Sequence, residues 1–236
     1  MSEADLAELV RRVDPDRFRG AIFAPAERRR DLFLLYAFNH ELARAREVAS
    51  TPPLALIRLH WWREVVEGGR REHPVAEPLR AALEAGRFDA AALLGLIDAR
   101  EAEAEPIPDL AGFLAYARGS SGGLARIAGR LLGAAESDLD VLEDLGTGYA
   151  IVAILSAAPA LSAAGRDLLP QDGTGVADLL AAARPLLAHP LPRTGRAAGL
   201  PAVLARRDLA RLERGEAPGP RGLGDRLAVI AAGLFG

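Results

Sequence analysis

The residue types that carry most enzyme chemistry are sparse in this chain. It has no cysteine, which excludes disulfides, thiolate metal sites and cysteine nucleophiles. All 29 basic residues are arginines, so no lysine is present to form a Schiff base or act as a general base. The four histidines have no metal-binding spacing, and the GxSxG, Walker A and strand-opening GxGxxG motifs are absent. Together these absences argue against most common hydrolases, kinases and dehydrogenases.

Three carboxylates have a spacing that would place them together. Glu136, Asp140 and Asp144 recur every four residues, so they share one face of a predicted helix. Such a face would either form a cation site or be a solvated acidic surface near a helix start, where the helix dipole favours negative charge. The solvated surface is the preferred interpretation.

A run of small residues, Gly119 to Gly123, interrupts a predicted helix. Each glycine inside a helix costs roughly 0.5–1 kcal/mol relative to alanine. The sequence therefore predicts a compensating feature at this point, which is either close helix packing or a bend beside a cavity.

The elements that position these residues are predicted to be helices. Alanine makes up roughly a fifth of the sequence and leucine and arginine are abundant, which favours helix, while alternating β-branched runs are missing. We predict one all-α domain over residues 1–236, with shorter C-terminal helices within 173–236. Apolar periodicity and capping signals predict helices at 26–50, 53–68, 75–85, 89–105, 109–133, 137–155, 175–187, 201–213 and 223–234, with loops at 190–199 and 215–222.

Length and charge limit the partners. A chain of 236 residues with a net charge of −3 has no basic footprint, so we expect no nucleic-acid partner. The N-terminal segment is acidic and lacks a signal-peptide pattern. The longest apolar stretch, Tyr149 to Ala164, contains Pro159 and is shorter than the roughly 20 residues of a spanning helix. We therefore expect a cytoplasmic protein that is at most peripheral to the inner membrane, with no signal peptide and no transmembrane helix.

Several motifs occur in an order that resembles the squalene/phytoene synthase family. The segment FRGAIFAPAERRRDLFLLYAFNHELARAREV is followed by IRLHWWREVVEG, and a short Asp-Arg-Phe helix precedes both. LIDAR at 96–100, YARGSSGGL at 116–124 and GRDLLP at 165–170 continue the same order. The resemblance covers about residues 14–172.

This resemblance implies a fold and a chemistry. Members of the family resemble other isoprenoid synthases, with an all-α bundle around a central apolar cavity. Active members join two prenyl diphosphates head to head. Two aspartate-rich motifs on facing helices hold Mg²⁺ ions, which bind the diphosphate and stabilise it as a leaving group.

The aspartates of both motifs are largely missing here. Counted from Leu35-Tyr36-Ala37-Phe38, the first motif corresponds to Ala43, Arg44 and Glu47. Counted back from Gly165-Arg166, the second motif falls on the following positions: Ala153, Ser156, Ala157 and Leu161. Alanine and leucine supply no metal ligand, and arginine repels a cation, although it pairs well with phosphate.

The chain therefore resembles the branch of the family that lacks these aspartates, which includes an assembly factor for respiratory complex I. This implies a non-catalytic binding or assembly protein without cofactors, whose partners would be subunits of a membrane respiratory complex. Two alternatives stay open at this point. One is a Mg²⁺-dependent prenyl transferase with a displaced metal site, and the other is a module that binds a prenyl or other lipid.

The residues predicted to line the cavity or contact a ligand come from the motif helices. For a lipid-binding module, His40 or Arg44 would engage an anionic head group. The full set of candidates is Tyr36, Phe38, His40, Arg44, Glu47, Tyr116 and Ser120.

Overall fold

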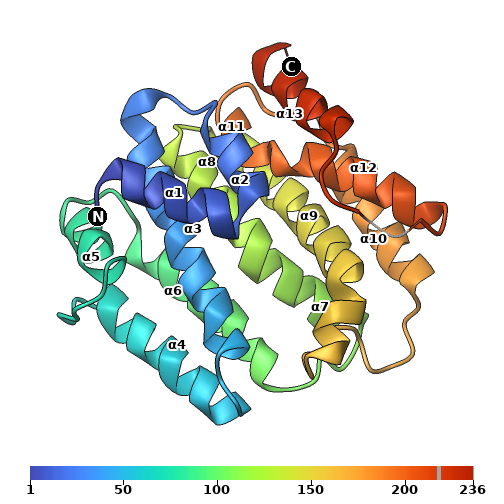
Figure 1. The fold of residues 1–236 in the computed structure, drawn as a ribbon, viewed down its shortest axis with the longest axis horizontal. Coiled ribbons are helices and arrows are strands. Elements are labelled where there is room, and N and C mark those ends of the chain that lie inside the picture. The colour runs from blue at the N-terminus through green and yellow to red at the C-terminus, as the bar shows by residue number, and fades with distance from the viewer. Residues whose placement is uncertain (217–218, 236) are drawn as a thin grey trace.

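The computed structural model describes residues 1–216 and 219–235, and Figure 1 shows them folded into packed helices. None of these described residues forms a strand, so the predicted all-α class is confirmed. The helices are α1 (Glu3–Val13), α2 (Pro15–Ala21), α3 (Ala26–Glu47), α4 (Pro52–Val66), α5 (Ala76–Glu84), α6 (Ala90–Glu101), α7 (Leu110–Ala117), α8 (Gly123–Leu131), α9 (Glu136–Ala163), α10 (Val176–Ala188), α11 (Arg196–Gly199), α12 (Pro201–Glu213) and α13 (Leu223–Phe235), with a 3₁₀ turn at Ala102–Ala104 and a π-helical turn at Arg118–Gly122.

The helix boundaries follow local signals closely. α12 has the predicted bounds, with Pro201 at its first turn, where the missing N–H costs nothing. The short helix α11 lies within the segment 190–199 that was predicted as a loop, because four residues are too few to show periodicity. Residues 217 and 218 of the predicted loop at 215–222 lie outside the described residues.

Helix α9 is longer than the sequence predicted, because it continues through Pro159 instead of ending at Leu155. Pro159 is exposed, and the helix continues past it to Ala163 although the carbonyl of Leu155 loses its helical N–H partner. The resulting 28-residue helix is long and apolar enough to cross a membrane by length and composition, which differs from the prediction. In this fold, however, α9 packs on α8, α10 and α12 as a core helix.

The predicted long helix over 109–133 is three pieces joined without a break. α7 passes into the π-helical turn and then into α8. A side chain at Gly122 would come within 2.5 Å of Oγ1 of Thr147, and one at Gly146 within 2.5 Å of the carbonyl oxygen of Ser121. The small residues therefore permit close packing of this turn on α9. Ser120 and Ser121 of the same turn also line a cavity, so both predicted explanations apply here.

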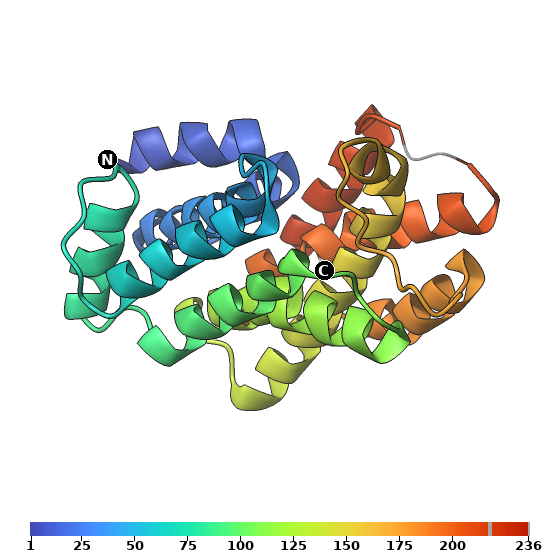
Figure 2. The same cartoon turned by 90° about the horizontal axis from the view of Figure 1, so that it is seen from below.

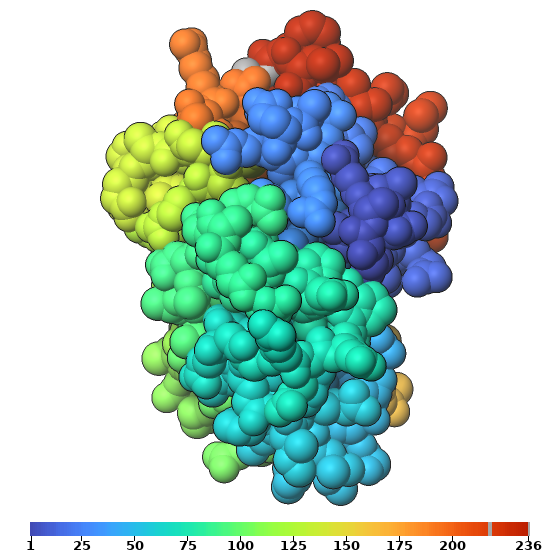
Figure 3. Space-filling model, turned by 90° about the vertical axis from the view of Figure 1, so that its left-hand side faces the viewer, coloured from blue at the N-terminus to red at the C-terminus, as the bar shows by residue number. Residues whose placement is uncertain are grey.

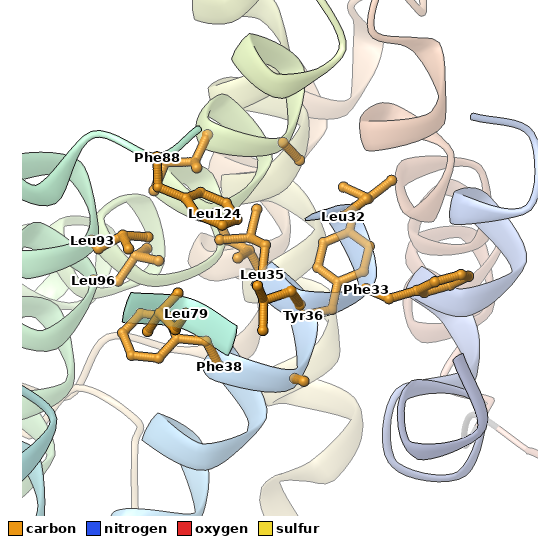
Figure 4. Close-up of a cluster of buried hydrophobic side chains, with 14 of the residues drawn as sticks. Leu32, Phe33, Leu35, Tyr36, Phe38, Leu79, Phe88, Leu93, Leu96 and Leu124 are labelled. Atoms are coloured by element: carbon orange, nitrogen blue, oxygen red, sulfur yellow. The ribbon is translucent and has the colours of Figure 1, made fainter. Parts of the chain in front are cut away.

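Two large apolar clusters form most of the core, and a small third cluster contains Leu200, Leu204 and Val229. One large cluster joins α1, α3, α4, α5, α6 and α8, and the other joins α7, α9, α10 and α12. Figure 2 shows the N-terminal helices (blue to cyan) on one side and the C-terminal helices (orange to red) on the other. Figure 4 shows part of the first cluster, where side chains of α3 meet Leu79 of α5 and Leu93 and Leu96 of α6.

Helices α4 and α5 cover one side of the first cluster, and Figure 3 views the molecule from that side. α4 buries Leu59 and Trp62 against its neighbours. The rings of Phe38 and Trp62 meet edge to face, with centroids 5.5 Å apart. This contact places Phe38 in the core.

Candidate functional site

A cavity of about 710 Å³ lies beside the second cluster, which contributes Tyr116, Ala150, Val152, Leu168 and Ala205 to its lining. The end of α3 and one face of α9 form walls of it, and Figure 1 shows these helices on either side of the centre of the molecule. The rest of the lining comes from the end of α1, the start of α2, α6, α7, the π-helical turn, the segment after α9, α12 and residues 219–221. A volume of this size is typical of pockets that hold a small organic ligand.

Most positions of the two aspartate motifs line this cavity. Ala43 and Glu47 do so from α3. All four positions of the second motif do so from α9: Ala153, Ser156, Ala157 and Leu161. The correspondence made from sequence therefore picks out the cavity wall, although the side chains at this wall are mostly apolar.

The predicted candidates divide into two groups. Glu47, Tyr116 and Ser120 line the cavity, and that they contact a ligand stays a prediction. Tyr36 lies close by, at a small void that it shares with Arg17 and other residues. Burial raises the pKa of Tyr36 well above its ordinary value, so the phenol is neutral.

The structure places the other three candidates elsewhere. Phe38 packs in the core, as described above. Arg44 projects to solvent and pairs with Glu41 at 3.3 Å, because one residue after Ala43 the helix has turned by about 100°. His40 is half-buried and is not part of the cavity lining. Burial lowers its pKa, which disfavours the charged form that an anionic head group would need.

Four cavity arginines were not singled out from sequence: Arg17, Arg100, Arg166 and Arg221. The first three lie inside motifs that carried the family resemblance, so the signal was present. Sequence alone gives no rule for choosing three or four among 29 arginines, because their placement depends on how distant helices pack.

Arg100 belongs to a buried polar cluster. Its guanidinium donates to Oε1 of Glu103 at 2.7 Å and to the Tyr116 hydroxyl at 3.0 Å. The Tyr116 hydroxyl in turn donates to Glu103 at 2.7 Å. Burial raises the pKa of Tyr116, so the hydroxyl keeps its proton and stays a donor. These bonds hold the three side chains together, although Nε of Arg100 is also buried without a hydrogen-bond partner among the described residues.

Arg166 lies beside this cluster but is bonded less well. Its Nη atoms are 3.4 Å from Oε1 of Glu47 and 3.5 Å from Oε2 of Glu103. Charge-assisted bonds of this type are normally about 2.7–2.9 Å. Both Nε of Arg166 and Oε2 of Glu103 are buried without a hydrogen-bond partner among the described residues. Arg166 also lines a second cavity of about 340 Å³.

At the opposite end of the cavity the arginines are bonded at shorter distances. Arg17 donates to Asp14 at 2.7 Å and to Ser121 at 2.6 Å, and its guanidinium lies 4.9 Å from the centre of the Tyr149 ring. Burial alone would lower the pKa of Arg17, but the nearby negative charge outweighs it and the pKa is raised.

At that same end, Arg221 donates to Asp16 at 2.7 Å and to Asp208 at 2.5 Å. These bonds connect the residues before α13 to α2 and α12. Arg211 also donates to Asp208, at 2.6 Å. The N-terminal and C-terminal segments are thus held together across one side of the cavity.

The carboxylates of the acidic surface predicted on α9, Glu136, Asp140 and Asp144, also form ion pairs with arginines. Arg126 contacts Glu136 and Asp140, and Arg118 donates to Asp144 at 2.7 Å. These carboxylates face α8 and the π-helical turn, so the solvated-face interpretation is only partly right. Glu136 and Asp140 are exposed and Asp144 is half-buried, and each of the three is ion-paired.

The side chains present do not fit the Mg²⁺ cluster of active family members. The carboxylates in the cavity lining are Asp14, Asp16, Glu47 and Asp208, and each pairs with an arginine. Mg²⁺ needs several oxygen ligands in octahedral geometry. Within residues 1–216 and 219–235, no group of three or more acidic or histidine side chains has the arrangement to hold a metal ion.

Comparison with known proteins gives relatives of two kinds. A sequence model of the squalene/phytoene synthase family matches residues 10–176. The chain is 28% identical over 172 residues to NADH dehydrogenase (ubiquinone) complex I, assembly factor 6, of Rattus norvegicus, and 27% identical over 175 residues to the protein of that name in Homo sapiens. Each match covers 70% of this chain and 52% of the relative, so the chain spans about half the length of these curated relatives.

Solved structures show the same fold. A dehydrosqualene synthase in complex with ligand superposes with a TM-score of 0.78 at 13% identity, covering 98% of this chain and 94% of that one. Squalene synthase HpnC from Alicyclobacillus acidocaldarius gives a TM-score of 0.68 at 18% identity, covering 90% and 93%. The predicted isoprenoid-synthase-like helical fold is therefore confirmed.

Proposed function

Because the chain belongs to the squalene/phytoene synthase family, we propose that it is a non-catalytic member that acts by binding, in the assembly of a membrane respiratory complex. The observation that carries the proposal is the lining of the cavity. Six positions of the two aspartate motifs face it, and Glu47 alone among them is a carboxylate. Glu47 pairs with Arg166.

With these side chains, a diphosphate leaving group would lack its counter-charges. Removing a single electrostatic stabiliser costs about 3–4 kcal/mol of barrier in other enzymes. Several losses together would bring turnover close to the uncatalysed rate, although such costs need not add. The names of the curated relatives support assembly of complex I as the role.

The catalytic part of the proposal is tested by product formation. Purified protein incubated with farnesyl or geranylgeranyl diphosphate and Mg²⁺ is expected to give no more product than a control without protein. Mg²⁺-dependent turnover that Glu47→Ala abolishes would overturn the proposal and establish the prenyl transferase instead.

The assembly part is tested in cells of the source organism. Deletion of the gene is expected to reduce fully assembled complex I on native gels and NADH dehydrogenase activity in membranes. Both are restored by the wild-type gene and, because no metal ligand is needed, by Glu47→Ala. Normal complex I in the deletion strain would contradict the role.

A second candidate function is lipid binding, which the cavity itself favours. One long wall consists of Val152, Ala153, Ala157 and Leu161 of α9, and apolar walls of this kind suit a hydrocarbon chain. Co-purification of a lipid in the presence of a chelator is the expected result. Binding of this kind is compatible with an assembly role.

A further inference from the structure

The polar group at one end of this cavity indicates what the ligand carries. We propose that Arg166 binds the anionic head group of a single-chain amphiphile without a metal ion, in exchange for Glu47, while the hydrocarbon tail lies along α9. The inference rests on the lipid-binding function proposed above and specifies its ligand. The shared head-group chemistry is a phosphate or a carboxylate.

The bonding of Arg166 is the first observation. Its side chain is only 14% exposed, yet Nε has no partner and both Nη contacts are long. A buried donor without an acceptor costs roughly 1–3 kcal/mol. An oxyanion is the group that best fits the guanidinium fork, since it accepts two parallel bonds.

The charges around Arg166 are the second observation. Arg100, Arg166 and Glu103 have side chains no more than 16% exposed, and together they carry one net positive charge. The remaining counter-charge is Glu47, whose side chain is 45% exposed at the end of α3. Glu47 can turn into water at little cost, whereas Arg166 cannot. An incoming anion therefore replaces Glu47 and keeps the buried group neutral.

The shape of the cavity is the third observation. Arg166 follows the end of α9, and Arg17 lies at Tyr149. Tyr149 and Leu161 are twelve residues apart, or about 18 Å along a helix. A chain of 12 to 15 carbons fits this length. At the distant end the guanidinium groups of Arg17 and Arg221 are already bonded to Asp14, Asp16 and Asp208, so an anion gains less there than at Arg166.

The test compares ligands that share one tail. Farnesyl monophosphate, farnesoic acid and farnesol are titrated against the protein by calorimetry, below their aggregation concentrations and with EDTA present. We expect at least one of the two anionic probes to bind about tenfold or more tightly than farnesol. The stronger of the two identifies a phosphate or a carboxylate head.

Variants assign the effect to the two residues. Arg166→Gln is expected to reduce the affinity for the anionic probe about tenfold and leave farnesol unchanged. Glu47→Gln should raise the affinity for the anionic probe about threefold, since a competing charge is removed. The matched controls are Arg184→Gln and Glu213→Gln, which alter an exposed ion pair far from the cavity, and neither should change binding.

The outcomes separate this inference from the lipid-binding function on which it rests. Equal affinity for farnesol and both anions, or loss of farnesol binding in Arg166→Gln, would overturn the head-group assignment and leave lipid binding in place. No binding of any probe would overturn lipid binding and the head-group assignment together. Binding of the anion that requires Mg²⁺ and is lost in Glu47→Gln would also overturn the head-group assignment, in favour of a metal site.

Discussion

At one end of the cavity Arg221 donates to two carboxylates from two different helices, whereas at the other end Arg166 has a buried Nε that finds no partner among the described residues. Both residues line the same cavity and both have largely buried side chains. The difference lies in their neighbours. Asp16 and Asp208 hold Arg221 at hydrogen-bonding distance, but Glu47 and Glu103 stand further from Arg166.

This contrast separates a structural role from a binding role. A saturated buried ion pair fixes geometry, and removing one partner leaves an uncompensated charge. A buried ion pair that lacks some of its hydrogen bonds lowers the stability of the folded state, and a bound ligand can remove that cost. The ion pairs of Arg221 therefore stabilise the fold, and a ligand gains the most binding free energy at Arg166.

The largest expected effect is on the Arg221 end. Arg221→Ala should lower the free energy of unfolding by about 3 kcal/mol, because Asp16 and Asp208 lose a buried partner. Urea denaturation measures the change. Arg214→Ala, which removes an exposed pair with Glu216, is the control and should cost less than about 1 kcal/mol. Equal costs for the two variants would contradict the comparison.

A somewhat smaller effect is expected at the cluster beside Arg166. Tyr116→Phe removes a hydroxyl that accepts from Arg100 and donates to Glu103. We expect a loss of about 2 kcal/mol of unfolding free energy, since bonds to charged groups are worth about 1.5–3 kcal/mol. Tyr149→Phe is the matched control, and a loss as large there would argue against the special role of the Tyr116 hydroxyl.

Low pH should destabilise the protein near Arg221 by protonating Asp225, a buried residue that accepts a hydrogen bond from Arg211. Burial by itself would raise the Asp225 pKa, but hydrogen bonds from Arg207 and Arg211 lower it from 3.8 to about 2. Because the folded pKa is depressed, the stabilisation is complete above about pH 4 and is lost as the pH falls towards 2.

Arg207→Gln removes one of these donors and brings the folded pKa of Asp225 closer to its unfolded value. We therefore expect acid unfolding, followed by circular dichroism, to move up by roughly half a pH unit. Arg184→Gln serves as the control. An unchanged acid midpoint in Arg207→Gln would show that Asp225 does not link stability to pH.

The smallest effect on stability is expected for Arg166→Gln. With long ion-pair contacts and an unpartnered Nε, the guanidinium contributes little to the folded state. The unfolding free energy should change by less than about 1 kcal/mol in either direction. A destabilisation as large as that of Arg221→Ala would remove the distinction between the two ends of the cavity.

Much of the fold was predictable from local patterns. The bounds of α12 and the start of α3 follow from proline positions and apolar periodicity, which depend on neighbouring residues alone. The end of α9 was not predictable, because a proline usually breaks a helix, and whether the helix continues past it, as α9 does past Pro159, depends on the packing of distant segments.

In the candidate site, too, some residues could be predicted from the sequence and others could not. Glu47, Tyr116 and Ser120 were found from motif positions, and they line the cavity. Phe38 and Arg44 come from the same motif helix but lie in the core and in solvent. The difference between these positions is a rotation of about 100° per residue about the helix axis, and its direction relative to the cavity depends on the packing of α3.

The sequence by itself determined the helical class, the family and the loss of the metal-binding aspartates, because each of these is a property of residue identity and order. Only the tertiary structure decided which arginines form short hydrogen bonds to carboxylates. Arg166 and Arg221 are chemically identical in the sequence, and their states differ because carboxylates from distant segments approach one closely and the other less so. Hydrogen bonding depends on tenths of an ångström between groups that the chain brings together only on folding.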